Sequence, residues 1–255
     1  MRAHSILLFS ALFIGSWTIA VTADDGLKPG MVVEGFVRVP NTYTQVALPE
    51  GKWEVAGVIE KANSVGTYFL MANLVQVADG KVSKAIHFFS PMRLTTSGFV
   101  ENKFCLRNDM HFRRTLASGA GQDQDCRWVN HLRLTLAGSK DELKNSTGKY
   151  LEAKNIAIPN HLIDRGFRFA DQFRDLNVHY FINPELDGFP AYPRTTWTDG
   201  PWHPQNTASD AKKKAYIDRQ IAWVEEWYPM VKAGWEGKLT EAPKAPTASA
   251  TSATK

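Results

Sequence analysis

Residues 66–89 read GTYFLMANLVQVADGKVSKAIHFF. Two runs rich in aromatic and β-branched residues flank the dipeptide Asp79-Gly80, which is a preferred pair for a two-residue hairpin turn. The stretch therefore predicts an antiparallel hairpin with strands at residues 66–78 and 82–89.

The first of these strands is apolar on both faces. Side chains alternate across a strand, so Phe69 and Met71 lie on one face while Leu70 and Leu74 lie on the other. A strand of this kind belongs to a sheet that is covered on both sides, by helices or by a second sheet.

The rest of the chain adds strands before and after this hairpin and helices toward the end. Alternating or β-branched patterns predict strands at residues 31–39, 43–48, 53–60, 99–107, 128–136 and 178–182. One helix is predicted at residues 141–153, and a longer one starts after a capping Ser209 or Asp210. Pro229 is expected to break or kink the longer helix, because proline lacks an N–H and crowds the preceding turn. The pattern indicates an α+β fold, with an antiparallel β-sheet and a C-terminal helix packed against it.

The two ends of the chain differ in composition from the middle. Residues 1–23 have the basic, apolar and small-residue order of a secretory signal peptide, ending at Ala23. Their apolar run of about 16 residues is short for a bilayer span of about 20, although an uncleaved N-terminal anchor is the alternative. Residues 241–255 are Ala, Thr, Ser, Pro and Lys with one Glu, a composition typical of a disordered tail. Residues 24–240 are left as a single α+β domain, with no membrane span after signal cleavage.

The chain contains two cysteines, Cys105 and Cys126. In an exported protein a lone pair most simply forms one disulfide, which would stabilise the fold by about 3 kcal/mol. A reactive thiol and a metal-bound pair are the alternatives. Signal peptide and disulfide together predict a periplasmic or secreted protein.

Composition and motifs exclude several functional classes. Hydrophobic residues make up 44% and charged residues 22%, as in ordinary globular proteins, and the formal net charge of +4 is too small to indicate nucleic-acid binding. The sequence has no nucleophile elbow, no zinc-protease motif, no phosphate-binding loop and no dinucleotide fingerprint. We therefore expect no cofactor and no metal, and the motifs leave open whether the protein is an enzyme.

A basic cluster surrounds the two cysteines. Arginine forks match carboxylate and phosphate oxygens, so the cluster is a candidate anion-binding site. Its members are Arg107, Arg113, Arg114, Arg127, His131 and Arg133. The alternative is that neighbouring aspartates pair with these arginines on the surface, which would give them no function.

An aromatic and proline-rich segment is the second candidate site. Prolines stiffen the chain, and rigid aromatic side chains are suitable platforms for a ligand. The candidate platform consists of Phe189, Tyr192, Trp197, Asp199, Trp202 and His203. The alternative is that the segment lies across the core and is fixed there by its tryptophans.

These features favour an exported, non-catalytic protein that binds a small ligand or a protein partner in the cell envelope. If the two candidate regions meet in space, they would line one site. The first alternative is an extracytoplasmic hydrolase whose acid–base site is assembled from His131, His203 or Asp199. The second is a structural subunit that docks through the aromatic segment.

Overall fold

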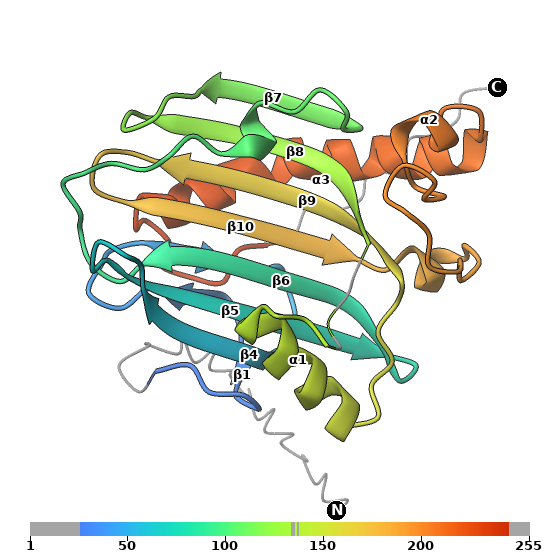
Figure 1. Ribbon diagram of the computed structural model, residues 1–255, viewed down its shortest axis with the longest axis horizontal. Helices are drawn as coiled ribbons and strands as arrows, with labels where there is room; N and C mark the ends of the chain where they lie inside the picture. The colour runs from blue at the N-terminus through green and yellow to red at the C-terminus, as the bar shows by residue number, and fades with distance from the viewer. Residues whose placement is uncertain (1–25, 134–135, 137, 245–255) are drawn as a thin grey trace, which may run out of the picture.

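A computed structural model describes residues 26–133, 136 and 138–244, so the predicted signal peptide and most of the predicted tail, residues 245–255, lie outside the described residues. Eight strands form one antiparallel sheet (Figure 1). Across the sheet the order is β1 (Val32–Val33), β4 (Trp53–Ala62), β5 (Tyr68–Ala78), β6 (Lys81–Pro91), β10 (Asp175–Ile182), β9 (His161–Ala170), β8 (Gln124–Arg133) and β7 (Phe112–Ala117). Two meanders, β4–β6 and β7–β10, thus join along the β6–β10 pair.

The hairpin predicted from residues 66–89 is confirmed as β5 and β6. Asp79 and Gly80 both have positive φ, 52° and 69°, as a type I′ turn requires. Glycine adopts this conformation without steric cost, so the turn and the register of both strands follow from the local sequence.

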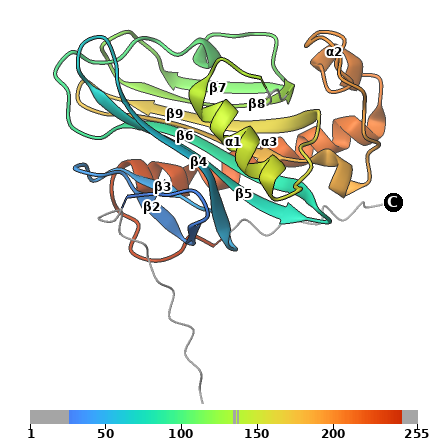
Figure 2. The ribbon, with the colours of Figure 1, turned by 60° about the horizontal axis from the view of Figure 1, so that its bottom comes forward.

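Helices cover the two faces of the sheet unequally (Figure 2). On one face lie the long helix α3 (Ala211–Trp235) and a small hairpin of β2 (Phe36–Arg38) and β3 (Gln45–Ala47). On the other face the shorter helix α1 (Glu142–Ala153) lies on β4 and β5. The predicted α+β fold, with an antiparallel sheet and a C-terminal helix packed against it, is confirmed.

The largest part of the core lies between α3 and the sheet. Val224, Trp227 and Val231 of α3 are fully buried against strand residues such as Phe167 and Tyr180. Asp210 caps the helix by accepting a hydrogen bond from the backbone N–H of Lys213. This burial anchors the C-terminal end of the chain to the central strands.

Three expectations about local structure were wrong in whole or in part. Of the break or kink expected at Pro229, the break is absent: helix α3 continues through the proline, because buried residues on both sides of it, Trp227 and Val231, hold it on the sheet. Residues 99–107 do not form a strand but include a short 3₁₀ helix, Lys103–Cys105. Strands β7 and β9 were missed, because polar residues interrupt their apolar pattern.

The predicted disulfide between Cys105 and Cys126 is present. It ties the 3₁₀ helix to β8 on the face that α3 does not cover, where Phe104 stacks on Trp128 with ring centroids 4.9 Å apart. No helix of the described residues has an apolar stretch long enough to cross a bilayer.

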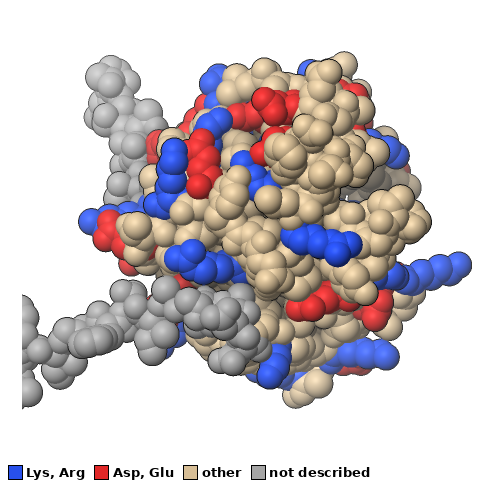
Figure 3. Space-filling model, turned by 90° about the vertical axis from the view of Figure 1, so that its left-hand side faces the viewer, with Lys and Arg blue, Asp and Glu red and all other residues tan. Residues whose placement is uncertain are grey.

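Charges of both signs are interspersed on the side of the molecule shown in Figure 3. Several basic side chains there and elsewhere lie next to carboxylates, for example Lys232 with Asp125 at 3.0 Å and Lys81 with Glu185 at 3.0 Å. Basic and acidic residues, which nearly balance over the whole chain, are thus also paired locally on the surface.

Candidate functional site

A groove lies on the face of the sheet opposite α3, between the sheet and the chain segments at residues 61–67 and 95–100. Its cavity volume is about 540 Å³. Its apolar side chains include Phe69, Met71, Phe89, Phe99 and Val100. Its polar and charged side chains are Lys61, Asn63, Thr67, Thr95, Ser97 and the pair Arg168 and Asp175. Clefts of this size, lined mainly by apolar side chains with a few polar groups, are typical of small-molecule sites.

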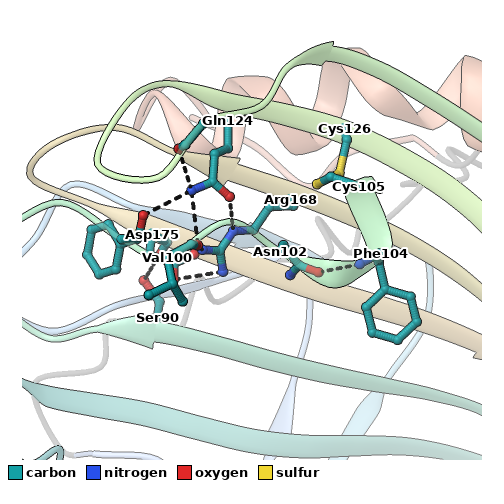
Figure 4. A network of polar contacts seen from close by, with 11 residues as sticks. Ser90, Val100, Asn102, Phe104, Cys105, Gln124, Cys126, Arg168 and Asp175 are labelled. Atoms are coloured by element: carbon teal, nitrogen blue, oxygen red, sulfur yellow. Dashed lines mark hydrogen bonds and ion pairs between the residues drawn. A yellow bond between two sulfur atoms is a disulfide. The ribbon is translucent and has the colours of Figure 1, made fainter. Parts of the chain in front are cut away.

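The charged pair holds one wall of the groove in place (Figure 4). Arg168 Nη1 lies 2.8 Å from Asp175 Oδ2, and the same guanidinium donates to the carbonyl of Val100 and to the side chain of Gln124. Gln124 Nε2 in turn donates to the carbonyls of Phe99 and Val100. The wall at residues 99–100 is therefore fixed to β8 and β9 before any ligand enters.

Asp175 is an unusual carboxyl group because it is buried in this wall. Burial raises the pKa of Asp175 to about 7, and the nearby Arg168 offsets only part of this effect. Its Oδ1 has no hydrogen-bond partner among the described residues. The carboxyl group is thus enclosed in the wall, with one oxygen paired to Arg168 and the other fully buried.

A row of five residues crosses the sheet next to the groove floor, on the same face. Pairing register places them directly opposite one another on β5, β6, β10, β9 and β8: Asn73, His87, His179, Gly166 and Trp128. The groove residue Met71 lies two positions before Asn73 on β5, and the groove residue Phe89 lies two positions after His87 on β6. Side chains two positions apart on a strand point to the same face of the sheet. The row therefore continues the groove floor.

His179 is held by a carboxylate. Its Nδ1 lies 2.9 Å from Asp164 Oδ1, and the other oxygen of Asp164 accepts a hydrogen bond from Trp128 Nε1 at 3.0 Å. The rings of Trp128, Phe104 and Phe181 surround the imidazole, with centroids 5.3, 5.4 and 5.7 Å away. An imidazole oriented by a carboxylate and flanked by aromatic rings has the arrangement of a general base.

His87 lies directly opposite, with its ring centroid 5.8 Å from that of His179. Its Nδ1 lies 2.9 Å from Asn73 Oδ1, and Asn73 Nδ2 donates to Thr147 Oγ1 of α1. Burial, and to a smaller extent His179, lowers the pKa of His87 to about 3. His87 is therefore neutral at physiological pH.

Both histidines keep Nε2 for another molecule. Within the described part of the chain, neither Nε2 has a hydrogen-bond partner and neither is among the fully buried unpartnered atoms. The described residues contain no group of three or more His, Cys, Asp or Glu side chains arranged to hold a metal ion. The two histidines do not line the cavity itself, but they lie beside its floor residues Met71 and Phe89 and are suited to accept hydrogen bonds there.

The arginines predicted as an anion site all have partners within the protein. Arg127 and Arg114 share the carboxylate of Glu225, and Arg107 pairs with Asp109. Arg113 donates to the carbonyl of Cys105, and Arg133 donates to the carbonyl of Thr195. Pairing with a neighbouring aspartate, the alternative to the anion-binding hypothesis, is thus seen for Arg107, whereas the other four arginines have partners of other kinds.

The basic cluster and the aromatic segment, the two candidate regions predicted from the sequence, do meet on the face of the sheet that carries α3. His131 stacks on Trp197 with centroids 4.9 Å apart, Arg107 lies over the same tryptophan, and His203 approaches it edge-on at 4.5 Å. The remaining aromatic side chains of the segment serve the core or its border: Phe189 and Trp202 are buried, and Tyr192 is half-buried.

The residues of the hydrolase alternative do not hydrogen-bond one another. His131 Nε2 lies 3.0 Å from the carbonyl of Trp197, His203 accepts from the backbone of Gln205, and Asp199 accepts from Thr196. Each of these hydrogen bonds is made to the segment at residues 189–207 or within it. The three side chains therefore hold this segment in place and do not form an acid–base pair with one another.

His131 should make the protein sensitive to acid. Burial lowers the pKa of His131 to about 4 from 6.5, so below pH 6.5 the unfolded chain binds a proton that the folded protein does not. The folded protein therefore loses stability as pH falls from 6.5 to 4. His87 acts in the same direction, whereas Asp175, with its raised pKa, acts in the opposite direction.

The variant His131→Gln isolates this contribution. Its slope of unfolding free energy against pH should be lower than that of the wild type by about 1.4 kcal/mol per pH unit within this window. Urea denaturation at several pH values measures both slopes. Parallel curves for the two proteins would show that His131 is not held neutral.

The histidine row and the groove were not predicted from the sequence. A signal was present, because Asn73 and His87 are polar residues with apolar neighbours on both sides, on the face shared with Met71 and Phe89. Strand β9, which carries Asp164 and Gly166, was not predicted, so the partners of His179 had no place in the expected fold. Pairing across the sheet was required to bring these residues together.

No protein-family model matches the chain, and neither the curated proteins nor the solved structures include a significant match.

Proposed function

We propose that the protein binds a small neutral amphiphile, an alcohol or ester with an apolar chain, in the groove on the open face of its sheet. The observation that carries the proposal is the cavity of about 540 Å³, whose lining combines apolar side chains such as Phe69, Met71 and Phe99 with the Arg168–Asp175 pair. Burial of apolar ligand surface against such side chains contributes about 25 cal/mol per Å².

The polar part of the lining favours a neutral head group over an acid. The charge of Arg168 is already balanced by Asp175 at 2.8 Å. A hydroxyl or ester group can hydrogen-bond to Thr95 or Ser97, which also line the cavity. A ligand carboxylate would in addition lose part of the hydration of a full charge.

The proposed setting is the periplasm or the extracellular space. The disulfide is compatible with an extracytoplasmic location, where such bonds persist. The predicted signal peptide supports the same setting. A partner-docking role for the aromatic segment is less well supported, because Trp202 and Phe189 are buried within the fold.

Displacement of the neutral dye Nile red by decanol tests this proposal. Met71→Trp should fill the groove and weaken the binding of both molecules at least tenfold. Val77→Trp is the matched control, because Val77 lies on the same strand at an exposed position away from the groove and should leave binding unchanged. Decanoate should compete less well than decanol.

If decanol displaces Nile red equally well from Met71→Trp and Val77→Trp, the ligand binds outside the groove. Absence of decanol binding to the wild type would overturn the proposal.

A further inference from the structure

From the row beside the groove, we infer that His179 is the general base of an esterase centre, which hydrolyses carboxylic esters with the water held between His179 and His87. The inference rests on the proposed function, because the apolar chain of the ester would lie in the groove. It adds a reaction to a site of which only binding was proposed.

The Nδ1 atoms of the two imidazole rings face partners on opposite sides. His87 turns Nδ1 toward Asn73 on β5, and His179 turns Nδ1 toward Asp164 on β9. Because β6 and β10 are adjacent and lie between β5 and β9, the two Nδ1 atoms point away from each other. The opposite ring edges, which carry Nε2, therefore face each other across a ring separation of 5.8 Å.

The hydrogen bonds of each ring determine its tautomer. The Asp164 carboxylate can only accept a hydrogen bond from His179 Nδ1, and Asn73 Oδ1 accepts from His87 Nδ1 because the Asn73 amide nitrogen donates to Thr147. Both Nε2 atoms therefore present lone pairs. A molecule shared by two such acceptors must donate two hydrogen bonds, as water does.

The hydrogen-bond partner of each histidine decides which of the two accepts the proton. Asp164 stabilises the imidazolium form of His179 and is itself held by Trp128 Nε1. His87 faces the neutral amide of Asn73 instead. His179 is therefore the base, His87 orients the water, and Asp164 is a positioning residue.

The groove floor determines where the substrate lies. Met71 and Phe89 of the groove floor lie two residues along their strands from the histidine row, which corresponds to about 7 Å. An ester carbonyl above the two histidines would thus extend its acyl chain directly into the groove. The substrate class is an ester of a medium-length apolar acid.

The reaction needs only the substrate and water from the solvent. His179 Nε2 takes one proton from the water as the water oxygen bonds to the carbonyl carbon, and the carbonyl π electrons move to the carbonyl oxygen. The C=O bond then re-forms, the bond from carbon to the alcohol oxygen breaks, and the departing alkoxide takes the proton from His179. The products are the acid and the alcohol, and His179 returns to its neutral form.

Hydrolysis of p-nitrophenyl decanoate by the full-length protein tests the inference. His179→Gln should lower kcat by a factor of about 100 or more, within the range for loss of a general base. His111→Gln is the matched control, because His111 lies in the cluster around Trp197 and donates to the Trp202 carbonyl, and it should leave kcat unchanged. Met71→Trp should reduce turnover of the decanoate far more than turnover of p-nitrophenyl acetate.

The role of Asp164 has its own measurement. In Asp164→Asn kcat should fall while KM for p-nitrophenyl decanoate stays close to the wild-type value, because the ring of His179 loses the acceptor that orients it but the groove is unchanged. A purely structural role would raise KM and lower the melting temperature together with kcat. If His179→Gln does not fold, His87→Gln provides the second test, because loss of the group that orients the water should also lower kcat with KM unchanged.

The outcomes separate this inference from the proposed function. Decanol binding without ester hydrolysis would overturn the esterase centre and leave the binding proposal in place. Full activity in His179→Gln, or loss of wild-type activity on treatment with EDTA, would also overturn it. Failure of both binding and hydrolysis would overturn both.

Discussion

Asp175→Ala is expected to lower the free energy of unfolding by about 3–5 kcal/mol, the usual cost of leaving one partner of a buried ion pair without the other. The side chains of Arg168 and Asp175 are only 6% and 2% exposed, so water cannot replace the missing carboxylate. Urea denaturation at neutral pH measures the loss. The groove wall at residues 99–100 should loosen as well, because Arg168 holds it through the carbonyl of Val100.

The matched control removes both charges. A double variant, Arg168→Met with Asp175→Leu, leaves no uncompensated charge and should be close to the wild type in stability. An Asp175→Ala variant within 1 kcal/mol of the wild type would mean that the pair is not buried as described.

Gly166→Ala is expected to cost about 3 kcal/mol, at the upper end of the usual range for overpacking. A Cβ atom at this position would lie 2.0 Å from Trp128 Cε2, far inside van der Waals contact. Trp128 cannot move aside, because it is fully buried, stacks on Phe104 and lies beside the disulfide. Gly166 therefore allows Trp128 to cross β9 and reach Asp164.

A second substitution checks the cause of this loss. Trp128→Phe makes room for the added methyl group, so Gly166→Ala should cost much less in that background than in the wild type. The indole N–H resonance of Trp128 should shift in Gly166→Ala as its hydrogen bond to Asp164 is lost. An equal cost in both backgrounds would show that Trp128 is not the obstacle.

Local sequence determined much of the fold. The turn at Asp79-Gly80 requires positive φ, the Asp210 cap starts α3, and the two cysteines lie at a separation that one disulfide can close. Each of these depends on residues near one another in sequence. Strand β9 was not predicted, because Asp164, Arg165 and Arg168 resemble a loop, and only their pairing partners in the folded sheet make them strand residues.

The candidate site depends on cross-strand pairing in the same way. His87 and His179 are neighbours only because β6 and β10 pair across a long chain separation, and Asp164 reaches His179 from a third strand. The sequence pattern drew attention instead to residues that are close in the chain, namely the arginines and the aromatic segment. These two regions do meet, because His131 and Arg107 both contact Trp197.

The most direct test of the groove as the functional site is an NMR titration of the protein, labelled with ¹³C at its methionine methyl groups, with decanol. Met71 lines the groove, whereas Met31 and Met230 pack against the core on the α3 side. The account predicts a saturable shift of the Met71 resonance, with those of Met31 and Met230 unchanged. A Met71 resonance that does not move while another methionine responds would contradict it.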